Sequence, residues 1–303
     1  LVLQVRWTGR YERCKNVHFQ EFTMSDVITH VGFSDESHHN LGKFRAISIV
    51  TMSEEFSREL TKILFEKIDD SGLSEFKWKK LRSARERLFA EKLIDVIVPL
   101  IRQKKIRVDT IIWEHTSDIK DNSSTHFQKM YYQLFKNVLW KRWGNNVTWG
   151  LYPDEQSVID WERIIDFLFG LSMKQLKIRG KMKLIDFLSN LSFKKLVEVK
   201  SEEEPIVQIA DLFAGLSVFS YEQNGRIIRG GQQNLFGVNA ISNSIDDKFI
   251  ILDYFLKYCS KMHVAVSRKK FGGLKTDNPE ENINFWLFKP YAKLINNKKI
   301  TEC

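Results

Sequence analysis

The residues that could carry chemistry begin with one stripe of a helix predicted to start at Pro205, which suits the first helical turn because it lacks an N–H. Gln208, Asp211 and Gly215 recur at three- and four-residue spacings, so they share this stripe. The positions around it are apolar: Ile206, Ile209, Ala210, Phe213 and Ala214. An ionised Asp in such surroundings is costly unless a metal, a cation or several donors compensate it. Asp211 is therefore the first candidate functional residue, and a salt bridge to Lys or Arg is its structural alternative.

Two further carboxylates come directly at or after predicted strands. Asp35 closes a strand predicted over residues 27–35, and Asp154 follows one predicted over 147–152. If these strands are neighbours in an α/β sheet, both side chains lie at one rim, where the helix can bring Asp211 alongside them. Three acidic groups repel one another unless cations neutralise them, and hard oxygen ligands select Mg²⁺ or Mn²⁺. A pair of such ions suits in-line phosphodiester cleavage. Ordinary turn roles remain the alternative for Asp35 and Asp154.

Alternating strand and helix patterns around these residues predict an α/β fold with a mixed sheet flanked by helices. Further strands are predicted over residues 44–50, 108–113 and 196–199. The strands 27–35 and 44–50, joined by a short polar loop, should form an antiparallel hairpin. A helix capped by Ser53 should end at Gly72. Other helical segments are expected over residues 75–82, 84–104 with an interruption at Pro99, 124–143, 158–169, 182–188 and 245–262.

The chain divides into three predicted parts. Residues 1–23 are expected to be an N-terminal extension, with an ordinary first strand as the alternative. Residues 24–223 form the main domain, with a helical insertion at about 54–105, and residues 224–303 are a C-terminal extension packing on it. Within this extension, the basic residues 268–270 and the aromatic-rich segment 285–288 could contact nucleic acid. The favoured interpretation of 285–288 is an aromatic strand packed on the core.

Composition narrows the classes of protein to consider. The 303 residues carry a formal net charge of +9 and a pI near 9.3, which favours a polyanionic partner such as nucleic acid. No run of eighteen or more apolar residues is present, so no membrane span is expected. The scattered Cys14, Cys259 and Cys303 suit a reducing cytoplasm and form no zinc motif. Oligomeric state does not follow from the sequence.

Three motifs in this order resemble the DUF3800 family. They are Asp35-Glu36-Ser37 at the end of a strand, Glu75-Phe76-Lys77 in a helical insertion, and Gln208-Ile209-Ala210-Asp211-Leu212 late in the chain. The resemblance covers roughly residues 25–288 and implies a fold similar to ribonuclease H. The family commonly has Gly after Asp-Glu-Ser, whereas this chain has His38.

The resemblance implies a two-metal nuclease using Mg²⁺ or Mn²⁺, with Asp35, Asp154 and Asp211 as catalytic metal ligands. Ribonuclease H enzymes take another carboxylate from their first sheet-packing helix, but residues 124–143 contain no Asp or Glu. Glu75 is the candidate catalytic substitute. Lys77, Gln208 and His38 are candidate substrate-binding residues, and the favoured role of Gln208 is a hydrogen bond to a metal ligand or the backbone. The alternative function is a catalytically degenerate module that binds nucleic acid or protein, in a defence or mobile-element system.

Overall fold

The computed structural model describes residues 27–38, 42–115, 123–143, 147–155, 159–164, 192–223, 243–268 and 272–289. Its centre is a six-stranded sheet of order β5-β4-β1-β2-β3-β8. The strands are β1 (His30–His38), β2 (Phe44–Ser53), β3 (Ile106–Glu114), β4 (Thr148–Pro153), β5 (Ser192–Leu196) and β8 (Ile283–Phe288). The β1–β2 and β2–β3 pairs are antiparallel, whereas β4 pairs parallel with β1 and with β5, and β8 pairs parallel with β3. The predicted α/β class with a mixed sheet is confirmed.

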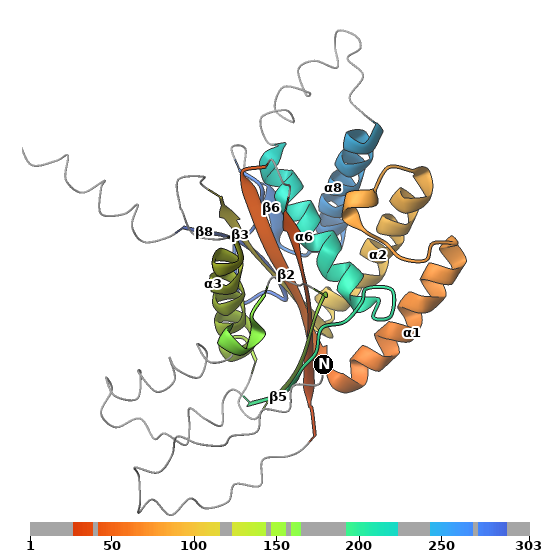
Figure 1. Ribbon diagram of the computed structural model, residues 1–303. Helices are drawn as coiled ribbons and strands as arrows, with labels where there is room; N and C mark the ends of the chain where they lie inside the picture. Colours follow the sequence, from red (N-terminus) through yellow and green to blue (C-terminus); the bar gives the residue numbers. More distant parts are fainter. Residues whose placement is uncertain are drawn as a thin grey trace, which may run out of the picture.

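Helices cover both faces of the sheet (Figure 1). One face carries α3 (Ser123–Phe135), which continues into the π-helical turn η2 (Lys136–Trp140). The other carries α6 (Ile206–Glu222), which packs across β1 and β2. Outside α6 lie α1 (Glu54–Ser71), α2 (Ala84–Arg102) and α8 (Asn243–Lys261), with α2 and α8 side by side. The small β6 (Val266–Arg268) and β7 (Leu274–Thr276) pair with each other near β8.

Burial explains the position of α6 between the sheet and the outer helices. Every residue from Ile206 to Ser220 is buried, so this helix is enclosed on all sides and lacks a solvent face. Its apolar side chains belong to the same hydrophobic cluster as Val31 and Phe33 of β1. A second cluster, which includes Tyr131 of α3, fills the opposite face of the sheet. The alternation of β1 therefore points Asp35 toward α6 and Glu36 toward α3.

The local signals for α1 are confirmed. The Ser53 hydroxyl accepts a hydrogen bond from the Phe56 N–H at 3.3 Å, and Gly72 adopts the left-handed conformation, φ 65°, at the C-terminal end. The predicted interruption at Pro99 is wrong, because α2 continues through Pro99 to Arg102. Pro99 lies near the end of α2, and the buried Ile97, Val98 and Ile101 around it hold that turn against the core.

Three other boundaries differ from their predictions. The predicted helix 75–82 is reduced to the 3-10 turn η1 (Trp78–Lys80). The first strand extends past Asp35 to His38, and β5 spans 192–196 instead of 196–199, although Val199 still forms an isolated bridge with Asp154. The segments 1–23 and 182–188, together with residues 158 and 165–169 of the predicted helix 158–169, lie outside the described residues. Within the described residues, the predicted helix 245–262 corresponds to α8.

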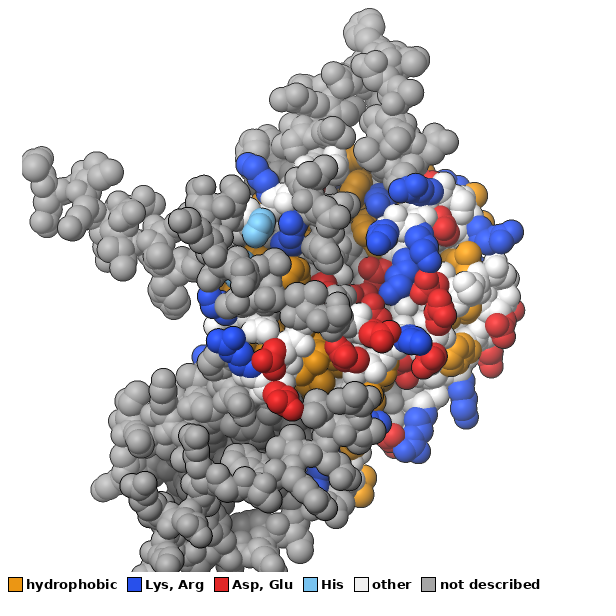
Figure 2. Space-filling view, in the orientation of Figure 1, with side chains coloured by type: hydrophobic (Ala, Val, Ile, Leu, Met, Phe, Trp, Pro, Cys, Tyr) orange, Lys and Arg blue, Asp and Glu red, His pale blue; other side chains and the backbone are white. Residues whose placement is uncertain are grey.

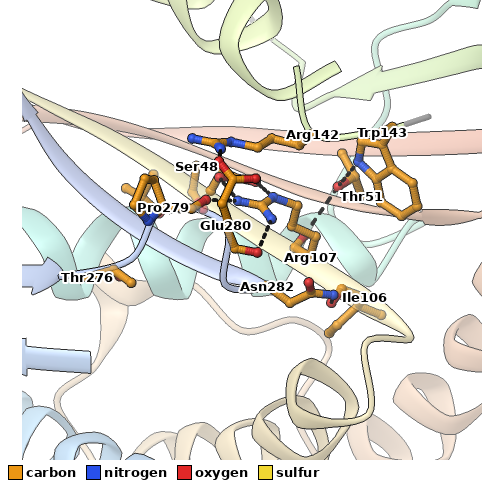
Figure 3. A network of polar contacts seen from close by, with 12 residues as sticks. Ser48, Thr51, Ile106, Arg107, Arg142, Trp143, Thr276, Pro279, Glu280 and Asn282 are labelled. Atoms are coloured by element: carbon orange, nitrogen blue, oxygen red, sulfur yellow. Dashed lines mark hydrogen bonds and ion pairs between the residues drawn. The ribbon is translucent and has the colours of Figure 1, made fainter. Parts of the chain in front are cut away.

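A buried ion pair on β3 also contacts the segment that leads into β8, and Figure 3 shows Arg107 beside Pro279 and Glu280 of that segment. Arg107 and Asp109 of β3 form two hydrogen bonds of 2.6 and 3.0 Å, and Arg107 also donates to the Pro279 carbonyl at 2.8 Å. Asp109 is fully buried, and the pair lies 5% exposed or less. Phe285 of β8 is 1% exposed, so the 285–288 strand packs on the core as favoured from the sequence. No helix within the described ranges has the length and apolarity needed to cross a membrane.

Candidate carboxylate site

Asp35 and Asp154 meet at one rim of the sheet because β1 and β4 are parallel neighbours. The Asp154 N–H donates to the Ser34 carbonyl at 2.8 Å, which extends the pairing one residue beyond β4. Phe33 and Tyr152, two positions before these acids, stack with their ring centroids 5.1 Å apart. Since side chains alternate along a strand, both carboxylates point to the α6 side of the sheet. The adjacency that the sequence analysis could state only as a condition is therefore present.

Asp211 joins them from α6, and its stripe has a clear structural role. The Gln208 side chain accepts from the Phe76 N–H at 2.9 Å, and Asp211 Oδ2 accepts from the Trp78 N–H at 2.5 Å. One turn further, a Cβ at Gly215 would lie 2.1 Å from the Trp78 ring. Gln208, Asp211 and Gly215 thus form a docking strip for residues 76–78. This use of the Phe76 and Trp78 N–H groups explains why residues 75–82 do not form the predicted helix.

Lys77 lies between the two docked residues and reaches the carboxylates. Its backbone is extended, φ −134° and ψ 123°, so its side chain points away from the buried Phe76 and Trp78. The Lys77 ammonium donates to Asp154 Oδ2 at 3.1 Å, with the two side chains 24% and 14% exposed. Burial alone would lower the pKa of Lys77, but the charges of Asp35, Asp154 and Asp211 outweigh it and raise that pKa. One ammonium therefore faces three carboxylates, and we call these four residues the carboxylate cluster.

The pKa values of the acids show that this single positive charge does not balance the cluster. Burial, together with the charges of Asp211, Glu36 and Asp154, raises the pKa of Asp35 well above its usual range despite Lys77. Burial likewise raises the pKa of Asp211 to about 6, against the opposing effects of the Trp78 N–H and Lys77. Such carboxylates bind a proton or another cation more readily than ordinary surface acids do.

Two further acids approach the cluster but are bound elsewhere. Glu75 accepts from Lys80 at 2.7 Å and from the Ser201 hydroxyl at 2.9 Å; burial alone would raise its pKa, but these bonds lower it. Glu36 lies on the α3 face, where it accepts from the Tyr131 hydroxyl at 2.8 Å, and burial raises its pKa to about 7. The helix that lacks Asp and Glu thus supplies a phenol that holds a carboxylate of β1.

The remaining candidates are placed as follows. Gln208 is 1% exposed and its amide also donates to the Ser201 carbonyl at 2.6 Å, so it binds backbone and is not placed to contact a substrate. His38 ends β1, and its side chain lies outside the described residues. Among the described residues, no group of three His, Cys, Asp or Glu side chains is arranged to hold a metal ion. Sequence reasoning missed the Lys77–Asp154 pair and the Tyr131–Glu36 pair, since each joins distant segments without a local motif.

Fold and site together define an α/β protein with a mixed sheet and a partly neutralised carboxylate cluster at one rim. No protein-family model matches its sequence. Two proteins of Methanothermobacter thermautotrophicus, described as uncharacterized proteins ORF2′ and ORF2, are 36% and 35% identical to it over 282 residues. Each alignment covers 86% of this chain and 94% of the relative. The chain therefore belongs to the family of these ORF2 proteins.

Proposed function

We propose that the protein is a metal-dependent nuclease of ribonuclease H-like architecture that hydrolyses phosphodiester bonds at the carboxylate cluster. The observation that carries this proposal is the meeting of Asp35, Asp154 and Asp211, from three separate elements, around one lysine. Carboxylates with elevated pKa values in a partly buried site are characteristic of functional positions. The net charge of +9 favours a polyanionic substrate.

The strand order supports the proposed architecture. The chain forms the antiparallel β1–β2–β3 unit first, and then adds β4 and β5 parallel on the other side of β1. The last major helix of this unit, α6, returns Asp211 to the strand ends. This is the order that the resemblance to the DUF3800 family implies. With no family model matching, that resemblance continues to depend on the three motifs alone.

The donor set fits Mg²⁺ or Mn²⁺ in its chemistry, because both ions prefer carboxylate oxygens. A closed coordination shell is not preformed among the described residues, since Lys77 bonds Asp154 and the Trp78 N–H bonds one oxygen of Asp211. Asp35, Asp154 and Asp211 would hold the ions, with Lys77 giving up its bond to Asp154. The bound ions would supply an activated water and stabilise the leaving oxygen.

The protein itself positions one charged group at this site, the Lys77 ammonium. The docking strip on α6 fixes the backbone on both sides of Lys77, so its ammonium is delivered to the cluster at a defined point. Once released from Asp154, this partly exposed ammonium could contact a phosphate oxygen of the substrate. Burial of Asp35 and Asp211 limits the water that reaches the acids.

The direct test compares the wild type with Asp35→Asn and Asp211→Asn on labelled DNA and RNA, single- and double-stranded, with Mg²⁺, Mn²⁺ or chelator. An Asn at position 211 still offers an oxygen to the Trp78 N–H, so that variant should keep the docked segment. We expect metal-dependent cleavage that falls at least 100-fold in both variants, since each removes a metal ligand. Asp69→Asn, on the exposed face of α1, is the matched control. Equal cleavage by wild type and both variants would refute the assignment.

A second candidate function follows from Lys77. If its ammonium is a permanent counter-ion, the cluster is structural and the protein is a binding module for nucleic acid or another protein. Lys77→Met separates the two, because methionine keeps an unbranched stem without the charge. In a nuclease, this variant should bind Mn²⁺ at least as tightly as the wild type, measured by titration calorimetry, yet cleave more slowly. In a binding module, Lys77→Met should lower the stability of the protein, and neither the wild type nor the variant should bind Mn²⁺.

A further inference from the structure

Lys248 of α8 is a buried cation without a carboxylate partner in the described part of the chain. It is 8% exposed, and its ammonium lies 5.5 Å from the centroid of the Trp78 ring. Its neighbour Asp247 is engaged with Arg87, at 2.8 Å. Lysines are almost never this buried unless they are paired, because removing an ammonium from water is costly. Contact with an indole ring compensates only part of that cost.

Among the described residues, positive charges and hydrogen-bond donors near Lys248 outnumber the groups that could accept from them. Burial, then the positive charge of Arg82, lowers the pKa of Lys248, and the charge of Asp211 acts in the opposite direction. Arg82 is exposed and lies two residues before α2, whose Arg87 pairs with Asp247, the residue that precedes Lys248. The indole N–H of Trp78 is buried and also lacks an acceptor among the described residues. Figure 2 shows Lys and Arg side chains gathered where α2 and α8 lie, next to a group of Asp and Glu side chains.

We propose that Lys248 and Arg82 bind a phosphate group next to the carboxylate cluster. A phosphate fits because it is a compact oxyanion that can accept from an ammonium and a guanidinium together. Trp78 links the two positions, because its backbone N–H donates to Asp211 while the Lys248 ammonium lies over its indole ring. The site is therefore placed to hold a neighbouring phosphate of a strand whose scissile group lies at the cluster. The identity of that strand as nucleic acid rests on the proposed function, but binding requires neither metal nor hydrolysis.

The test measures binding in chelator, with labelled single-stranded DNA and RNA by fluorescence anisotropy and inorganic phosphate by calorimetry. Lys248→Met keeps the packing over Trp78 and removes the charge. Lys257→Met is the matched control, because it removes the same charge from the same helix, at an exposed residue already paired with Asp253 at 2.6 Å. We expect Lys248→Met and Arg82→Gln each to weaken binding about 10-fold, and the control to change it less than about twofold. The salt dependence of log K should also become shallower by about 0.7 in Lys248→Met and in Arg82→Gln, and stay unchanged in the Lys257→Met control.

Stability distinguishes a ligand site from a structural charge. Removing an unpaired buried ammonium should leave the thermal midpoint of Lys248→Met equal to or above that of the wild type. A lower midpoint would mean that Lys248 serves the fold, and equal losses in Lys248→Met and Lys257→Met would mean non-specific attraction; either result overturns the proposal. Equal binding of polyglutamate overturns the phosphate assignment. Binding of inorganic phosphate without oligonucleotide binding would keep the site and exclude nucleic acid as its source. All of these binding measurements are made without metal. Their outcome therefore does not depend on whether the protein cleaves nucleic acid.

Discussion

Gly215→Ala tests the docking strip that organises the site. A Cβ at this position would lie 2.1, 2.3 and 2.7 Å from three atoms of the Trp78 ring, closer than any van der Waals contact allows. The ring cannot shift toward α6, so the added methyl group must displace Trp78 and the segment around it. The bond from the Trp78 N–H to Asp211 then weakens, and Lys77 moves away from Asp154. Gly215→Ala should therefore alter the carboxylate cluster, although it changes no charged residue.

The expected change in the free energy of unfolding is the sum of two destabilising effects and one stabilising effect. Overpacking a buried contact costs about 1 to 3 kcal/mol, and loss of a hydrogen bond to a charged group costs about 1.5 to 3 kcal/mol. Replacing Gly by Ala inside a helix returns about 1 kcal/mol. We expect Gly215→Ala to lower the free energy of unfolding by about 2 to 5 kcal/mol, opposite in sign to the effect of helix propensity. Urea denaturation measures this change directly.

A double-mutant cycle with Trp78→Ala identifies the cause. With the indole removed, the methyl group at position 215 has room, so Gly215→Ala should be neutral or stabilising by about 1 kcal/mol in that background. The coupling between the two positions should therefore exceed about 2 kcal/mol. A neutral or stabilising Gly215→Ala in the wild-type background would refute the seating of Trp78 on α6. An equal loss in both backgrounds would refute Trp78 as its cause.

Two further predictions concern the buried charges. Glu36 has its pKa raised from 4.5 to about 7, so the folded state binds a proton that the unfolded state releases; the contribution of Glu36 to stability should fall by about 3 kcal/mol as pH rises from about 4.5 to 7. Glu36→Gln should remove this contribution and make the profile shallower in urea denaturation across pH, while Asp35 and Asp211 keep theirs; an unchanged slope would contradict the assignment. Arg107→Met should cost about 3 to 5 kcal/mol because it leaves Asp109 buried without its partner. Arg58→Met, which removes an exposed pair with Glu54, should cost under about 0.5 kcal/mol, and similar losses for both would count against the buried pair.

The features that could be predicted from the sequence depend on residues a few positions apart. The caps of α1 depend on contacts over three residues at each end, so Ser53 and Gly72 could be recognised directly. The stripe of α6 was also visible from spacing, and Asp211 was correctly singled out as a buried acid that requires partners. Its partner on the backbone was not visible, since the Trp78 N–H comes from 133 residues away.

The incorrect predictions share this non-local cause. Residues 75–82 have the composition of a basic helix, but their N–H groups bond Gln208 and Asp211, and only η1 remains helical. Lys77 could be viewed equally as a phosphate contact or a solvated lysine, because its partner Asp154 lies 77 residues ahead. No pattern along a single segment encodes such a pair.

The docking strip couples the helical insertion to the carboxylate cluster, because each of them helps to hold the other in place. Asp211 uses one oxygen to hold Trp78 in place, and the segment it holds carries Lys77 into the field of Asp211 itself. A cation that entered the cluster would compete with Lys77 for Asp154 and weaken one of the attractions that keep the insertion in place. By linkage, loosening the insertion would in turn favour cation binding. The insertion between β2 and β3 therefore contributes, through Lys77, to the electrostatic state of the acids at the sheet rim.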